Sequence, residues 1–188
     1  LPICFYCSGT NTITPTECPP GHYCPSGTEY ATQYPCKIGT YSNRSGLVEA
    51  GDCMKCSPGS ACTLEGLTEP NADCAPGYYC LKGANSSIPI TAEQGGLCGA
   101  GHVCLGGASS KYPVDGVTGM FCPRGHYCSG GNANPTACPG GTYTNITGSS
   151  ECSTCPEGFY CDLAATDPNI CPEGYWCPKG TNHSTQYA

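Results

Sequence analysis

Apolar residues are sparse along this chain, and they follow neither the spacing of an amphipathic helix nor a long strand alternation. Leu, Ile, Val and Phe number 8, 7, 4 and 3, which makes 22 of 188 residues. A composition this poor in large apolar side chains does not build a sizeable hydrophobic core. The 27 glycines and 18 prolines favour turns. The pattern predicts a loop-rich chain with short two-stranded hairpins and little helix.

Cysteine content changes this picture from disorder to a cross-linked scaffold. The chain has 20 cysteines, a density typical of disulfide-rich proteins made in an oxidising compartment. Bridges can replace a core because each lowers the entropy of the unfolded chain. The count is even, so we expect ten disulfides and no free thiol.

A seven-residue unit, Cys-x5-Cys, recurs with glycine at its fourth position and usually an aromatic residue at its sixth. Its copies are Cys18–Cys24, Cys56–Cys62, Cys74–Cys80, Cys98–Cys104, Cys122–Cys128, Cys155–Cys161 and Cys171–Cys177. A second unit, Cys-x2-Gly-Thr-Tyr, begins at Cys36 and Cys138 and is followed by Cys53 and Cys152. The chain is therefore close to two copies of a longer repeat.

The cysteines fall into four groups of four and two pairs. The groups are Cys4, Cys7, Cys18 and Cys24; Cys56, Cys62, Cys74 and Cys80; Cys98, Cys104, Cys122 and Cys128; and Cys155, Cys161, Cys171 and Cys177. Spacing alone leaves three connectivities open in each group. We expect cysteine-rich modules at residues 1–53, 54–97, 98–152 and 153–188, the first and third EGF-like and the last incomplete.

The run CPPGHYCPSGT, PCKIGTYSNRSGL and CSPGSAC resembles the ephrin-receptor-like cysteine-rich repeats of large extracellular proteins, which look related to EGF-like and growth-factor-receptor-type modules. The resemblance covers essentially the whole chain. It implies an elongated tandem array and a first-to-third, second-to-fourth and fifth-to-sixth disulfide pairing. The implied bridges are Cys4–Cys18, Cys7–Cys24, Cys36–Cys53, Cys56–Cys74, Cys62–Cys80, Cys98–Cys122, Cys104–Cys128, Cys138–Cys152, Cys155–Cys171 and Cys161–Cys177.

The recurring glycine and aromatic residue have a structural interpretation. Glycine reaches the positive φ of a tight turn without steric cost, and the aromatic ring two residues later can cover a disulfide as a miniature core. We expect this role at Gly21/Tyr23, Gly39/Tyr41, Gly77/Tyr79, Gly125/Tyr127, Gly141/Tyr143, Gly158/Tyr160 and Gly174/Trp176. The alternative, a row of sugar-stacking rings, is less favoured because these positions repeat with the scaffold.

Four N-x-S/T tripeptides predict N-glycosylation at Asn43, Asn85, Asn145 and Asn182. Asn43 and Asn145 occupy the same position after Gly-Thr-Tyr, and Asn85 and Asn182 follow equivalent cysteines. An acceptor that returns in register would place glycans periodically on accessible turns. The alternative is an unoccupied surface asparagine.

Metal, redox and catalytic readings are weaker. Cys4-x2-Cys7, Cys53-x2-Cys56 and Cys152-x2-Cys155 have zinc-knuckle spacing, but so many cysteines favour oxidation over metal binding, and a redox Cys-x2-Cys would need a βαβ setting. His22, His102 and His126 share one slot of the repeat where other copies have Tyr or Phe. An acid–base residue would not be interchangeable with phenylalanine. We expect no enzyme activity, no metal and no cofactor.

Calcium binding is not favoured either, because the carboxylates Asp52 and Asp115 stand alone and isolated carboxylates make weak sites. The net charge is −7, which disfavours nucleic acid and anionic lipid. No stretch is apolar enough to span a membrane.

Together these features favour an architectural extracellular or cell-surface glycoprotein, a segment or protomer of a glycan-coated filament, stalk or matrix. The alternative is the ligand-binding ectodomain of a receptor. The partner would be copies of the chain or neighbouring modules. The irregular N-terminal LPICFYC and the C-terminal GTNHSTQYA, which aligns with Gly27-TEYATQYP, suggest either an excerpt of a longer array or a protomer that docks head to tail.

Overall fold

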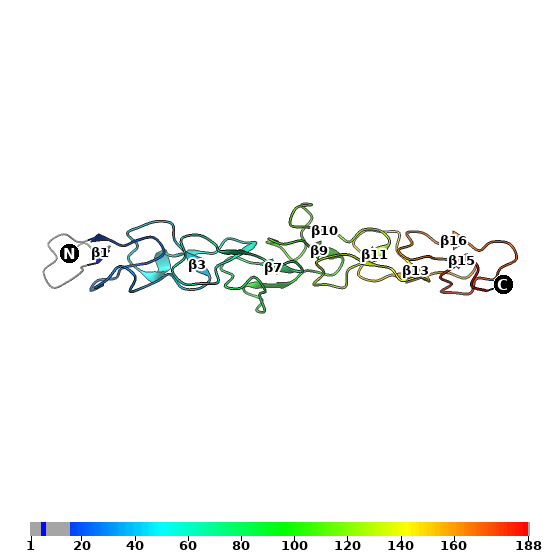
Figure 1. Cartoon of the computed structure of the whole chain (residues 1–188), viewed down its shortest axis with the longest axis horizontal. Helices are drawn as coiled ribbons and strands as arrows, with labels where there is room; N and C mark the ends of the chain where they lie inside the picture. The colour runs from blue at the N-terminus through cyan, green and yellow to red at the C-terminus, as the bar shows by residue number, and fades with distance from the viewer. Residues whose placement is uncertain (1–4, 7–15, 188) are drawn as a thin grey trace. The chain divides into compact units, whose positions relative to one another are not determined.

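The computed structural model describes residues 5–6 and 16–187 of the chain (Figure 1). Its backbone divides into two compact units, Leu1–Ala75 with Tyr79–Gly96, and Pro76–Tyr78 with Leu97–Ala188. The finer division into modules at residues 53, 97 and 152 stays a prediction. Within the described residues no helix is long and apolar enough to cross a membrane.

Every strand in the described part of the chain belongs to a two-stranded sheet. The pairs are β1 (Phe5–Tyr6) with β2 (Thr16–Glu17), β3 (Thr40–Tyr41) with β4 (Met54–Lys55), β5 (Ser60–Ala61) with β6 (Ala72–Asp73), β7 (Tyr78–Cys80) with β8 (Gly95–Leu97), β9 (His102–Cys104) with β10 (Gly119–Phe121), β11 (His126–Tyr127) with β12 (Thr136–Ala137), β13 (Thr142–Tyr143) with β14 (Ser153–Thr154), and β15 (Phe159–Tyr160) with β16 (Asn169–Ile170). The described residues contain a single short 3-10 helix, η1 (Ala50–Asp52), which lies between β3 and β4 in the chain. The expected disulfide-rich, hairpin-based fold with almost no helix is confirmed.

Nine disulfides cross-link the described residues. They are Cys18–Cys24, Cys36–Cys53, Cys56–Cys62, Cys74–Cys80, Cys98–Cys104, Cys122–Cys128, Cys138–Cys152, Cys155–Cys161 and Cys171–Cys177. The two predicted bridges of the pairs, Cys36–Cys53 and Cys138–Cys152, are confirmed. Cys4 and Cys7 lie outside the described residues, so a tenth bridge stays a prediction.

The first-to-third and second-to-fourth pairing is wrong. The bridges Cys4–Cys18, Cys7–Cys24, Cys56–Cys74, Cys62–Cys80, Cys98–Cys122, Cys104–Cys128, Cys155–Cys171 and Cys161–Cys177 are all replaced, because each Cys-x5-Cys unit closes on itself. The reason lies in the glycine turn at the centre of the unit. It reverses the chain and leaves the two Cα atoms 5.6–5.9 Å apart, the separation that a disulfide prefers.

The two units of the second kind have the same turn. Counting from Cys36, the glycine is Gly39 and the position of the second cysteine is held by Ser42, whose carbonyl oxygen accepts the N–H of Gly21 at 2.8 Å. Thr144 takes the same position after Cys138 and accepts the N–H of Gly125 at 2.9 Å. We call each Cys-x2-Gly-x2-(Cys/Ser/Thr) segment a cysteine turn. There are nine of them in the described residues, beginning at Cys18, Cys36, Cys56, Cys74, Cys98, Cys122, Cys138, Cys155 and Cys171.

Backbone hydrogen bonds join each cysteine turn to the next through its glycine. In the first of the two compact units, the N–H of Gly39 donates to the Cys62 carbonyl at 2.8 Å, and the carbonyl of Gly39 accepts the N–H of Cys56 at 2.9 Å. The backbones approach so closely that a Cβ on Gly39 would lie 2.7 Å from the carbonyl oxygen of Gly83. We call this pair of bonds the glycine relay.

The relay continues in the second unit with unchanged geometry. Gly101 donates its N–H to the Cys128 carbonyl at 2.8 Å and accepts the N–H of Cys122 at 2.8 Å. The same pair of bonds recurs at Gly77, Gly125, Gly141 and Gly158, with Thr144 in place of the second cysteine at Gly125. All nine turn glycines have φ between 74° and 87°, which confirms the expected positive-φ turn.

The interior consists mainly of half-cystines. The only other buried apolar residues in the described part of the chain are Leu47, Ala61, Ala84, Val103, Ala108 and Pro residues of the loops. The aromatic ring of a turn is half-buried, and the Tyr23 side chain packs against Leu47 and the Cys36–Cys53 bridge of the next turn. Trp176 is instead 63% exposed, so the expected cover role does not hold there. Cross-links thus take the place that a hydrophobic core has in larger domains.

A second positive-φ residue follows most cysteine turns. Its N–H donates to the carbonyl oxygen of the first cysteine in the turn before the one that it follows. Gly180 does so to Cys155 at 2.9 Å, and Ala164 does so to Cys138 at 2.9 Å. Ala164 has φ of 59° and is the one described non-glycine residue with positive φ. The Cβ of alanine makes this conformation unfavourable.

Native disulfide mapping tests the turn-closing bridges. Cleavage of the unreduced protein after Glu65 should separate a peptide that contains Cys56–Cys62 from one that contains Cys74–Cys80, because no bridge crosses this loop. Mass spectrometry without reduction reads the result. Peptides that stay joined until reduction would contradict the structure and restore the first-to-third pairing.

Replacing Ala164 by glycine should stabilise the second unit by ~1 kcal/mol, because glycine adopts φ of 59° without the Cβ penalty. Gly180→Ala is the matched opposite: its Cβ meets only Thr154 Cγ2 at 3.6 Å, so the loss should reflect φ alone. Urea unfolding of the oxidised protein measures both. Equal stability of Ala164→Gly and the parent would show that the positive φ is wrong.

Candidate functional site

The first candidate site is the loop that carries Asn43. Ser42, in the slot of a second cysteine, closes a tight turn around it: the Arg44 N–H donates to Ser42 Oγ at 3.2 Å, and Ser42 Oγ lies 3.2 Å from the Arg44 carbonyl. Ser42 is buried while Asn43 is exposed. The bridge that Ser42 cannot form runs from Cys36 to Cys53 instead, so the asparagine lies inside a longer disulfide-closed loop.

Asn145 is held in the same way in the second unit. Thr144 is 5% exposed, and its hydroxyl lies 2.7 Å from Ser149 Oγ and 3.4 Å from the Ile146 carbonyl. Asn145 itself is exposed. The two asparagines therefore occupy equivalent turns, each inside the loop that one of the two long bridges closes.

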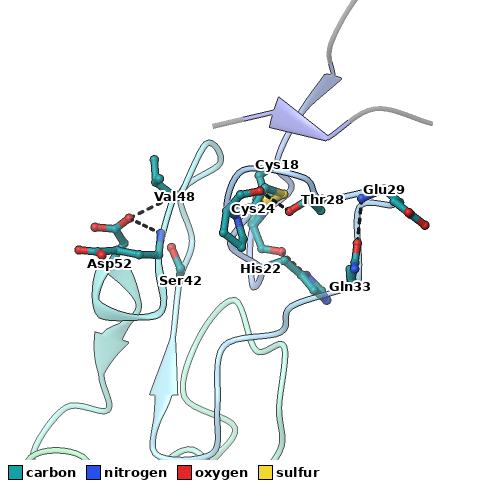
Figure 2. The surroundings of a disulfide bond; sticks show 12 residues. Cys18, His22, Cys24, Thr28, Glu29, Gln33, Ser42, Val48 and Asp52 are labelled. Carbon is teal, nitrogen blue, oxygen red and sulfur yellow. Dashed lines mark hydrogen bonds between the residues drawn. A yellow bond between two sulfur atoms is a disulfide. The ribbon is translucent and has the colours of Figure 1, made fainter. Parts of the chain in front are cut away.

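Asn85 and Asn182 lie two residues after a positive-φ glycine. Asn85 is half-buried, whereas Asn182 is exposed and donates its N–H to Gln186 Oε1 at 3.0 Å. The equivalent bond earlier in the chain runs from the Glu29 N–H to Gln33 Oε1 at 2.8 Å, beside the Cys18–Cys24 bridge (Figure 2). The Gln186 side chain thus closes a local turn at Asn182, and this acceptor position is part of the fold.

Asp52 closes the loop that begins at Asn43. Its Oδ2 accepts the N–H of Val48 at 2.9 Å and of Glu49 at 3.0 Å (Figure 2). These bonds, with the nearby charge of Arg44, hold the pKa of the Asp52 carboxyl below its usual value. An open hollow of about 460 Å³ lies beside it, lined by Arg44, Ser45, Gly46, Leu47, Gly51 and Asp52.

The zinc-like spacings do not bring thiols together. Cys53 and Cys56 belong to different disulfides, and so do Cys152 and Cys155. Cys4-x2-Cys7 lies outside the described residues. A half-cystine has no thiolate to offer a metal, so the spacing reflects consecutive bridges in the described part of the chain.

The repeated histidines also do not converge. Nδ1 of His22, His102 and His126 lies 3.2, 3.3 and 3.2 Å from the carbonyl oxygen two residues earlier. Each ring therefore serves its own turn. His183 instead contacts Thr185 in the loop after Asn182.

Two longer hairpins depart from the repeat, and sequence reasoning missed them. Segments 81–98 and 105–122 share the pattern Leu-x-Gly-Ala, then Pro-(Ile/Val), Gly and Cys at matching positions. In the first, a Cβ on Gly95 would lie 2.9 Å from the Cγ of buried Pro89; in the second, Pro113 packs against Gly119 in the same way. This alignment was the available signal.

The second hairpin carries exposed apolar side chains. They are Leu105, Tyr112, Val114, Val117, Met120 and Phe121, between 39% and 79% exposed. The His102 ring packs against Tyr112 at 5.1 Å and against Phe121 at 4.9 Å between centroids. We call His102, Tyr112 and Phe121 the aromatic cluster. Its Tyr112 ring lies over Gly99, where any side chain would collide with it.

Asp115 shapes the tip of this hairpin. Its Oδ1 accepts the N–H groups of Val117 and Thr118 at 2.8 and 2.7 Å, and its Oδ2 accepts the Thr118 hydroxyl at 2.7 Å. The pKa of the Asp115 carboxyl is lowered to about 2. The Thr118 hydroxyl is the main cause, and these backbone donors add to it. The carboxylate is thus committed to the loop, which supports the structural interpretation over a calcium ligand.

The comparisons with known proteins add no relative. No protein-family model matches the chain, and no curated protein matches it.

Asp115→Ala should loosen the hairpin tip, so that trypsin cleaves the native protein after Lys111 several-fold faster. Asp115→Asn is the control, because its Oδ1 can still accept the backbone N–H groups. The carboxyl has a lowered pKa when folded, so its contribution is complete above pH ~4 and is lost as the pH falls through about 2. Equal cleavage of the alanine variant and the parent would contradict this role.

Proposed function

We propose that the chain is an architectural extracellular glycoprotein, a segment or protomer of a glycan-coated filament, stalk or matrix. The observation that carries the proposal is the glycine relay. It repeats one backbone junction, such as Gly39 with Cys56 and Cys62 or Gly101 with Cys122 and Cys128, from turn to turn within each unit. Repeats that bond to their sequence neighbours form linear arrays, and the relay uses backbone atoms, which leaves the side chains outside for decoration or contact.

The disulfides support the localisation that we propose. Nine disulfides are typical of a secreted or extracellular protein. We place the chain at the cell surface or in a matrix, as a non-enzymatic protein without metal or cofactor. The kinship with ephrin-receptor-like and EGF-like repeats remains part of the proposal. Its support is the spacing of the cysteine turns, whereas the pairing of the turn-closing bridges is different.

N-glycans complete the proposed role. The acceptors are Asn43, Asn85, Asn145 and Asn182, of which all but the half-buried Asn85 are exposed. Asn43 and Asn145 lie at matching positions inside the loops that the two long bridges close, so the glycans would recur with the scaffold. Partners would be copies of the chain in a head-to-tail filament, or neighbouring modules of a longer chain.

The second candidate function is a ligand-binding ectodomain. The observation in its favour is the hairpin 105–121, because its exposed apolar side chains, Val117 at 79% and Val114 at 58%, depart from the repeat. Exposed apolar patches mark contact sites for partners. This candidate requires a single partner surface, whereas the architectural role requires contacts that recur along the array.

Small-angle scattering combined with sedimentation of the glycosylated protein tests the architectural proposal. A compact protein of this length has a radius of gyration of ~16 Å. We expect a clearly larger value and a mass that rises with protein concentration as copies associate.

A monodisperse monomer with the compact radius would overturn the proposal. A monodisperse, extended monomer would overturn the head-to-tail filament and leave the stalk segment and the receptor ectodomain. The matched control is the reduced and alkylated protein, whose expansion and loss of association show that the folded array causes the measured behaviour.

A further inference from the structure

The Asn145 loop and the aromatic cluster meet in the second unit. The N–H of Gly148 donates to the Cys122 carbonyl at 2.7 Å. Beside it, a Cβ on Gly148 would lie 3.4 Å from Cδ1 of Phe121. Asn145 is three residues from Gly148, a span of at most ~11 Å along the chain. A glycan on Asn145 would therefore start within a few residues of the cluster.

The cluster has the properties of a fixed apolar shelf. Tyr112 is 53% exposed and Phe121 is 50% exposed, so part of each ring faces solvent. Their positions are set by His102 between them and by the space over Gly99. Aromatic faces are electron-rich and attract the weakly polar C–H groups of a sugar ring.

We infer that the aromatic cluster binds the inner sugars of the N-glycan on Asn145 and holds that glycan against the protein. The inference rests on the proposed glycosylation and deepens it. It gives the exposed rings an occupant that is covalently attached to the neighbouring loop, so no separate partner is needed to cover them.

The Asn43 loop provides an internal control. Its Gly46 donates to the Cys18 carbonyl at 2.8 Å, as Gly148 does to Cys122. The neighbour of Gly46, however, is the Glu17 carboxylate, with Oε1 2.9 Å from the place of a Cβ. A tyrosine precedes each asparagine by two residues, at Tyr41 and Tyr143. Positions 17 and 121 thus differ clearly between the two loops, because a phenylalanine ring lies beside Gly148 and a carboxylate lies beside Gly46.

Glycan release measures the difference. For this measurement the protein is produced in secreted form in a host that attaches N-glycans. Mass spectrometry maps the occupancy of each acceptor, and peptide N-glycosidase is then applied to the native oxidised protein. Rates are normalised to those of the reduced, denatured protein, which removes sequence preference. We expect release at Asn145 about tenfold slower than at Asn43, equivalent to ~1.4 kcal/mol.

Two variants test the cause. Phe121→Glu introduces the residue that lies beside the Asn43 loop at the equivalent position, Glu17. It should bring the rate of glycan release at Asn145 to within about twofold of the rate at Asn43. Glu17→Phe places a ring beside Gly46 and should slow release at Asn43. In NMR spectra of ¹³C-labelled glycan, sugar C–H signals shifted upfield by the rings should disappear in Phe121→Glu.

The outcomes separate the two proposals. An Asn145 that carries no glycan overturns the glycosylation proposal at this position and the shelf with it. A glycosylated Asn145 with the same normalised rate as Asn43, or a rate that Phe121→Glu leaves unchanged, overturns the shelf alone. Retained bridges in Phe121→Glu, checked by mass spectrometry, show that the variant still folds.

Discussion

The structure depends on a glycine turn at positive φ that reverses the chain within seven residues. This turn brings two cysteine Cα atoms to about 5.8 Å, so the bridge forms inside the turn. The same turn presents the glycine N–H and C=O outward for the next turn, and the absence of a Cβ lets the backbones approach. A side chain on Gly39 would meet the Gly83 carbonyl at 2.7 Å. The glycine of each turn thus serves the fold of the turn, its disulfide and its contact with the next turn.

Because bridges and backbone atoms hold the chain, its side chains are largely free to vary. The described residues expose many large apolar side chains, and the loops between turns differ in length. Function is therefore expected in the loops. In the Asn43 and Asn145 loops, serine or threonine replaces a cysteine and the bridge moves outward to Cys53 or Cys152. The scaffold gains a longer loop there without losing a cross-link.

The sequence predicted the turns and the two longer bridges, and it missed the shorter bridges that close each Cys-x5-Cys unit. Turn glycines such as Gly21, short hairpins and the Cys36–Cys53 bridge follow from spacing and turn chemistry. The pairing inside each group of four did not, since spacing is silent on which Cα atoms meet. Ser42 was not recognised as a cysteine substitute because its role is played by a backbone carbonyl. Ala164 resembles any loop residue until its φ is known.

Amide hydrogen exchange of the oxidised protein tests the glycine relay most directly. We predict that the N–H groups of Gly39, Gly101 and Gly141, which donate to carbonyls of later turns at 2.8, 2.8 and 2.7 Å, exchange orders of magnitude more slowly than the amides of Val114 and Asp115 in the exposed hairpin tip. Their protection should disappear together when the bridges are reduced. Relay amides that exchange as fast as those of the hairpin tip would contradict the account.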